Sequence, residues 1–137
     1  QEMGINVHGY AHLWCYRHSI VISSYKDLIV WQKSIIIVSD IYQISRQLPA
    51  IEQYGLSSQM QRAAVAIASN IAEGHRRNNR KEYRQFCGVA LGSAAELETQ
   101  LIITSRVYPK IDVQNALNLS EELQKMLSKL IKTLGSA

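Results

Sequence analysis

The spacing of apolar residues predicts a helical chain from Tyr25 onward. Between about Lys26 and Leu48, apolar side chains recur three or four positions apart, as on one face of a helix: Leu28, Trp31, Ile35, Val38 and Tyr42. Pro49 is expected to end this helix, because the residue before a proline is disfavoured in the helical conformation.

A second helix is predicted to begin at Ser57 or Ser58, where a hydroxyl can accept an amide proton of the first turn. Gly74 is expected to end it, since glycine readily adopts the left-handed conformation that closes helices. Its apolar face combines large residues with alanines: Met60, Ala64, Ile67 and Ile71.

The third predicted helix, from about Arg80 to Tyr108, has the most regular spacing in the chain. Its apolar face contains Tyr83, Cys87, Ala90, Ala94, Leu97, Leu101, Thr104 and Tyr108. Pro109 stops it, Asp112 is a candidate cap for a fourth helix, and that helix presents Leu123, Leu127, Leu130 and Leu134 before Gly135.

Four helices with short connections predict the fold class: all-α, an antiparallel up-and-down four-helix bundle. We assign residues 25–137 to the bundle domain and residues 1–24 to an N-terminal appendage, because that stretch shows neither a helical nor an alternating period.

A run of four apolar residues, 35–38, exceeds what one helix face can bury, because consecutive residues point in nearly all directions around the axis. We therefore expect Ile36 and Ile37 to face outward and contact another subunit, since exposed apolar patches mark interfaces. The alternative is a wide core-facing stripe with one exposed isoleucine.

Composition narrows the class of protein. The chain has 137 residues, 47% hydrophobic and 19% charged, enough apolar residues for one folded domain. Its 7 Gly and 2 Pro argue against a turn-rich β-sandwich. Cys15 and Cys87 form no disulfide framework or zinc motif, so a reducing cytoplasm is the expected setting. No segment is expected to span a membrane or act as a signal peptide.

The strongest charge feature is a basic cluster between the second and third predicted helices. Five Lys and Arg residues lie there against Glu73 and Glu82, a local excess of three positive charges in a chain of net charge +4: Arg76, Arg77, Arg80, Lys81 and Arg84. Such a cluster can bind phosphates with salt-dependent affinity. The alternative is a solvated turn whose cations favour the helix dipole.

Four polar residues lie near the predicted apolar faces: Asn70, Glu73, Glu96 and Glu98. We expect them to form hydrogen bonds between helices or subunits that fix the register. A carboxylate metal site is the less favoured alternative, because a di-iron bundle needs Glu-x-x-His units and the sequence has none. Catalytic residues, metals and cofactors are not predicted, since the sequence contains no nucleophile elbow, phosphate loop or zinc motif.

Three stretches resemble a bacterial family encoded in intervening sequences of the 23S rRNA gene. They are the opening residues 28–33 (LIVWQK), residues 54–74 (YGLSSQMQRAAVAIASNIAEG), and residues 81–86 with 92–101 (KEYRQF and GSAAELETQL). The resemblance covers roughly residues 25–134. It implies an antiparallel four-helix bundle that assembles into a ring, a homopentamer. It also implies relatedness to the accessory variability determinant of diversity-generating retroelements, which is similar in fold and helps a reverse transcriptase and its RNA.

The leading hypothesis is a non-enzymatic, ring-forming homo-oligomer that binds RNA or a ribonucleoprotein through the repeated basic turn. The alternative is a structural adaptor ring that recruits a protein partner, such as a reverse transcriptase, without touching nucleic acid itself.

Overall fold

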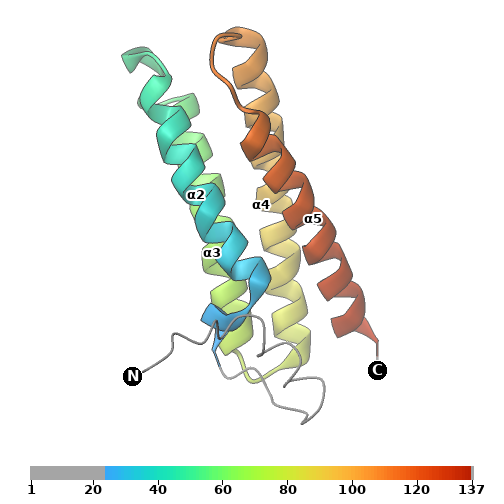
Figure 1. Cartoon of the computed structure of the whole chain (residues 1–137). Coiled ribbons are helices and arrows are strands. Elements are labelled where there is room, and N and C mark those ends of the chain that lie inside the picture. Colours follow the sequence, from blue (N-terminus) through green and yellow to red (C-terminus); the bar gives the residue numbers. More distant parts are fainter. Residues whose placement is uncertain (1–23, 137) are drawn as a thin grey trace, which may run out of the picture.

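The computed structural model describes residues 24–136, and these form an antiparallel bundle of four long helices (Figure 1). The helices are α2 (Ile29–Gln47), α3 (Leu56–Arg76), α4 (Arg80–Val107) and α5 (Gln114–Gly135). Short 3-10 turns, η1 (Tyr25–Asp27) and η2 (Ala50–Glu52), precede α2 and α3. The predicted all-α four-helix bundle is confirmed, and residues 24–136 contain no strand. The predicted appendage lies almost entirely outside the described residues.

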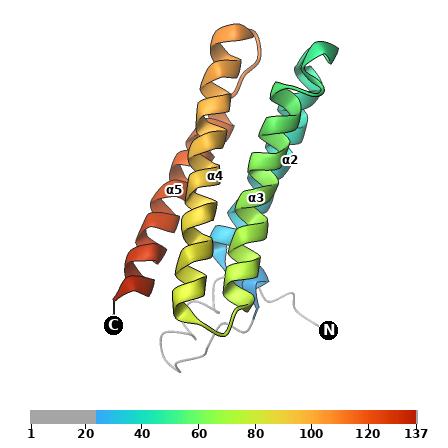
Figure 2. The same cartoon turned by 180° about the vertical axis from the view of Figure 1, so that it is seen from behind.

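Each helix packs beside the next along the chain, and α5 returns to α2 (Figures 1 and 2). The α3 and α4 pair makes the most extensive contact and the α2 and α5 pair the least extensive of the four. An ion pair of 2.6 Å between Lys33 Nζ and Glu122 Oε1 links α2 to α5 across this looser seam.

Local sequence explains most helix ends. The side chain of Asn79 accepts a hydrogen bond of 3.0 Å from the Glu82 amide and so caps α4. Asp112 accepts one of 3.0 Å from the Gln114 amide at the start of α5, although Val113, and not the predicted Asp112, occupies the N-cap position. Leu48, which precedes Pro49, is extended and ends α2.

Gly74 does not end the second long helix, which continues to Arg76. Gly74 instead allows α3 to pack closely against α4, because a Cβ atom at this position would lie 2.7 Å from Phe86 Cβ of α4. The start was also misplaced, because Gly55 occupies the N-cap position and no serine side chain caps α3.

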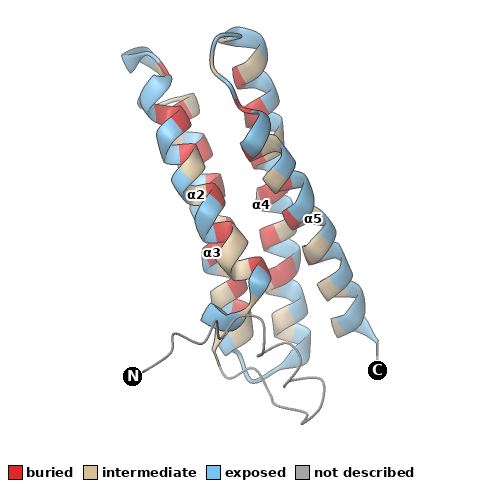
Figure 3. Ribbon diagram, viewed as in Figure 1, coloured by how far each residue is buried: buried red, intermediate tan, exposed pale blue. Residues whose placement is uncertain are grey.

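The predicted apolar faces of α3 and α4 are confirmed: Met60, Ile67, Cys87 and Leu97 are fully buried, and Tyr83 and Tyr108 are half-buried against the core. Buried residues line the inner sides of the helices (Figure 3). The predicted face of α2 is wrong in part: Leu28, Trp31 and Val38 pack half-buried against the core, but they border the buried face and do not form its centre. The predicted residues Ile35 and Tyr42 are exposed, and the fully or nearly fully buried residues of α2 are Val30, Ser34, Ile37, Ile41, Ile44 and Ser45.

Of the helices described, α4 alone is long and apolar enough to cross a membrane by length and composition, which the sequence analysis did not identify. Its buried stripe, which includes Cys87 and Leu97, packs in the bundle core, and this packing accounts for part of its apolar character.

Candidate functional site

The basic turn, defined as Arg76, Arg77, Arg80, Lys81 and Arg84, lies at the end of the bundle where α3 passes into α4. The C-terminal end of α5 lies at the same end (Figure 2). All five side chains of the basic turn are exposed. The fold therefore gathers cations from two helices beside the last turn of a third.

Two members of the basic turn are attached to α5. Arg80 donates from Nε to the Leu134 carbonyl at 2.9 Å, and from Nη2 to the carbonyls of Thr133 and Ser136. Arg84 donates from Nε to the Ile131 carbonyl at 3.2 Å. The last four carbonyls of a helix lack partners within it, so Arg80 helps to satisfy those of Thr133 and Leu134, and both arginines complement the negative end of the α5 dipole.

The other three cations project from the turn itself. Arg77 pairs with Glu73 at 3.1 Å and lies over the ring of Phe86, 5.2 Å from its centroid. Within the described residues, the side chains of Arg76 and Lys81 make neither a hydrogen bond nor an ion pair. Arg76 and Lys81 are therefore the members of the basic turn most available to a partner.

Beneath the turn, α3 and α4 are joined by an apolar and aromatic contact. The rings of His75 and Tyr83 meet edge to face with centroids 5.6 Å apart. Burial raises the pKa of Tyr83 to about 12, with the nearby Cys87 contributing, and raises the pKa of the Cys87 thiol to about 11. A thiol protonated near neutral pH is a poor nucleophile, so the geometry gives Cys87 a packing role.

Of the four polar residues predicted to form hydrogen bonds between helices or subunits, one joins two helices of this chain. Glu98 accepts a hydrogen bond from Gln124 and joins α4 to α5. The bonds observed for the other three stay within one helix: Asn70 to the Ala66 carbonyl, Glu73 with Arg77, and Glu96 with Gln100. Helical spacing of four explains this preference.

The predicted outward pair on α2 is half correct. Ile36 is 54% exposed, but Ile37 is fully buried in the core, so the expectation that Ile37 faces outward is wrong. The two residues are about 100° apart around the helix axis, which brings one to the core and turns the other away from it.

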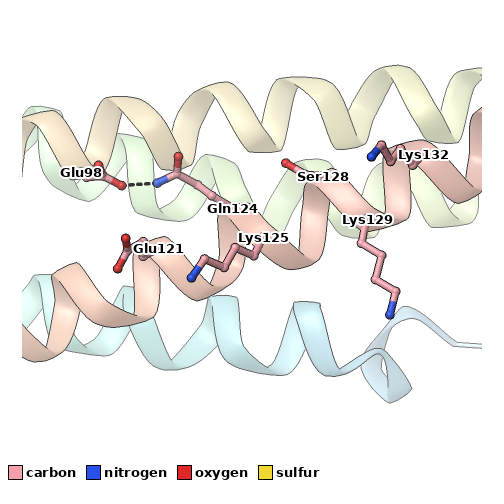
Figure 4. Close-up of a pocket in the computed structure, with 7 residues that line it drawn as sticks. All are labelled: Glu98, Glu121, Gln124, Lys125, Ser128, Lys129 and Lys132. Atoms are coloured by element: carbon pink, nitrogen blue, oxygen red, sulfur yellow. Dashed lines mark hydrogen bonds between the residues drawn. The ribbon is translucent and has the colours of Figure 1, made fainter.

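A second basic feature, which was not predicted from the sequence, lies on α5 (Figure 4). A groove of about 600 Å³ is lined by one α4 residue and six α5 residues: Glu98, Glu121, Gln124, Lys125, Ser128, Lys129 and Lys132. The signal was present in the spacing, because Lys125, Lys129 and Lys132 lie four and three residues apart and so share one helix side. We call this the α5 lysine groove.

Residues 24–136 contain no group of three or more His, Cys, Asp or Glu side chains that could hold a metal ion. A smaller groove of about 420 Å³ between α2 and α3 is lined partly by Tyr42, Arg62 and Val65.

Comparison with known proteins agrees with the fold. The bundle is similar to a crystal structure, at 1.70 Å resolution, of a protein with unknown function from the S23 ribosomal protein family of Bacteroides thetaiotaomicron VPI-5482. That match has a TM-score of 0.69 and 27% sequence identity, and covers 76% of this chain and 99% of the other. No curated protein matches this chain. The family model described as 23S rRNA-intervening sequence protein matches residues 26–129, so the chain belongs to the 23S rRNA-intervening sequence protein family.

Proposed function

We propose that this protein is a non-enzymatic, oligomeric bundle that binds the backbone of RNA through the basic turn. The observation that carries this proposal is the gathering of five exposed cations at one end of the bundle, of which Arg76 and Lys81 have no partner among the described residues. Lys and Arg side chains that neutralise phosphates release counterions, which supplies affinity without base recognition.

The residues of the basic turn have two different roles in this proposal. Arg80 and Arg84 hold the turn against α5, while Arg76, Arg77 and Lys81 face outward and provide the phosphate contacts. Anchoring the turn lowers the entropy lost when those side chains bind. The name of the family and that of the related structure's family, which mention 23S rRNA and a ribosomal protein, are in keeping with an RNA partner.

Oligomerisation would multiply this binding. The exposed Ile36 on α2, together with Ile29 on the same side of that helix, is the basis for a subunit interface. In a ring, one basic turn per subunit would repeat around the assembly. Several weak phosphate contacts on one RNA would then act together, and avidity would exceed the affinity of a single turn.

The test is a salt titration of binding to fluorescein-labelled oligouridine RNA, comparing the parent protein with the triple variant Arg76→Gln/Arg77→Gln/Lys81→Gln. Losing three phosphate contacts should lower the slope of log affinity against log salt by about 2. Between 50 and 200 mM salt the parent should therefore lose about 16-fold more affinity than the variant.

A matched control removes the same charge elsewhere. Arg46, Arg106 and Lys110 are exposed cations at the opposite end of the bundle, so Arg46→Gln/Arg106→Gln/Lys110→Gln has the same net charge as the turn variant. If both triple variants bind alike, net charge rather than the turn determines binding, and the proposed site is wrong.

A second candidate function is an adaptor that recruits a protein, and a specific observation favours it. At the end opposite the basic turn, Ile51 and Tyr54 are 84% and 88% exposed. Exposed large apolar side chains on a short turn are typical of a contact with another protein. Replacing both with serine should abolish recovery of such a partner and leave RNA binding unchanged.

A further inference from the structure

We propose that the α5 lysine groove is a second phosphate-binding segment, which continues the basic turn along the outer side of α4 and α5. This inference rests on the proposed function, because it names where the same RNA backbone runs after leaving the turn. The ligand is the phosphodiester backbone of RNA, and the contacts are made by Lys125, Lys129 and Lys132.

The groove and the turn are joined through the end of α5. Arg84 and Arg80 bind the carbonyls of residues 131, 133, 134 and 136, in the same helix turns that carry Lys129 and Lys132. The three groove lysines are exposed and make no ion pair among the described residues. Arg80 and Arg84 of α4 thus lie beside the end of α5, which follows Lys129 and Lys132 along the chain.

The side chains of the three lysines spread over the outer side of α5 (Figure 4). Lys132 extends toward α4, Lys129 extends toward the beginning of α2, and Lys125 extends along α5 toward Glu121. With a rise of 1.5 Å per residue, the Cα atoms of Lys125 and Lys132 are separated by about 10 Å.

The charge order along the groove gives it a direction. Its far end carries Glu98 and Glu121, and the oxygen Oε2 of Glu98 already accepts a hydrogen bond from Gln124. The positive charge therefore increases toward the basic turn, and a bound strand would run from Lys125 to the turn. Glu121, exposed beside Lys125, would repel a strand that extended further.

The chemistry of the lining favours a polyanion over a folded protein partner. All seven lining residues are polar or charged. Protein interfaces depend on buried aromatic or aliphatic anchors at their centre, and this groove provides none. Lysine is a flexible, strongly hydrated point charge, which suits contact with successive phosphates that require no fixed geometry.

The experiment measures binding of fluorescein-labelled oligouridine RNA by full-length protein across a range of salt. The variant Lys125→Gln/Lys129→Gln/Lys132→Gln should lower the salt slope by about 2 relative to the charge-matched control Arg46→Gln/Arg106→Gln/Lys110→Gln. Circular dichroism checks that both variants keep the helical content of the parent.

A variant that is expected to bind RNA more tightly provides a second test, because misfolding would weaken binding and could not strengthen it. Glu121→Gln takes away the negative charge at the end of the groove, so it should tighten RNA binding, by severalfold at 50 mM salt. Unchanged affinity in Glu121→Gln, together with a lysine variant that behaves like the control, would overturn the inference.

The outcomes separate this inference from the proposed function. If the turn variant has a smaller salt slope and the lysine variant matches the control, RNA binds at the basic turn and the inference about the groove is wrong. If only the lysine variant loses slope, RNA binds at the groove alone, so the proposed site at the turn is wrong and the groove does not continue it. If the parent fails to bind RNA and instead binds labelled polyglutamate through the lysines, both RNA assignments are wrong.

Discussion

The substitution Gly74→Ala tests the close packing of α3 against α4 beneath the basic turn. A Cβ atom at Gly74 would lie 2.7 Å from Phe86 Cβ, 3.1 Å from the Tyr83 ring and 3.3 Å from the Tyr83 carbonyl oxygen. A change of side-chain rotamer moves neither Phe86 Cβ nor a backbone carbonyl. The two helices must therefore separate to admit one methyl group.

The magnitude follows from two opposing terms. Overpacking a closely packed site costs about 1–3 kcal/mol, and this contact is short enough to fall at the upper end. Replacing glycine by alanine in a helix interior returns about 0.5–1 kcal/mol. The expected net loss is about 2 kcal/mol, which lowers the midpoint of urea unfolding by roughly 1 M for a domain of this size.

Gly88→Ala is the matched control, because it also replaces a helical glycine by alanine. Gly88 lies in the interior of α4, and a Cβ atom there would meet nothing within 4 Å. Only the higher helix propensity of alanine applies here, so the free energy of unfolding of this variant should rise by about 0.5–1 kcal/mol. Urea unfolding followed by circular dichroism measures both. If Gly74→Ala is neutral or stabilising, the account of α3 and α4 packing is refuted.

Three further predictions follow from individual contacts. Arg80→Ala should lower the free energy of unfolding by about 1 kcal/mol, because it exposes unpaired carbonyls at the end of α5, whereas Lys81→Ala should change it little; equal urea midpoints would contradict this. Burial raises the Cys87 pKa from its usual 9.0 to about 11, so the folded state keeps a proton that the unfolded state releases. The resulting stabilisation is complete below pH 9 and is lost as pH rises through 11, so the stability difference between the parent and Cys87→Ala should shrink across that range; a constant difference would show that the thiol is not shielded. Ile36→Asp should reduce the assembly mass by light scattering while preserving helicity, and Ile37→Ala should instead cost about 2–5 kcal/mol of stability; an unchanged mass for Ile36→Asp would remove the basis for that interface.

Spacing predicted α3 and α4 well because central residues of their buried faces, such as Met60, Ile67 and Leu97, are flanked on both sides by small or polar residues. It failed on α2, where the continuous run at 35–38 leaves the phase of the helix undetermined. The true face includes Ser34, a fully buried serine whose hydroxyl donates to the Trp31 carbonyl at 2.5 Å. A polar residue that satisfies itself locally gives no apolar signal.

Local charge density located the basic turn in the sequence. It did not separate Arg80 and Arg84, which contact α5, from the three residues that face outward. All five residues of the basic turn lie within nine positions of sequence, so their proximity required no tertiary information. The role of Arg80 depends on carbonyls more than fifty residues away, and no local pattern encodes that contact. The α5 lysine groove lies on a different helix from the turn, and only the antiparallel return of α5 brings it there.

The most direct test of the central claim is the salt dependence of RNA binding by the parent and by Arg76→Gln/Arg77→Gln/Lys81→Gln. The account predicts that the parent binds oligouridine with an affinity that falls steeply with salt, and that the variant binds more weakly with a slope smaller by about 2. A parent that does not bind, or a variant with the same affinity and slope as the parent, would contradict it.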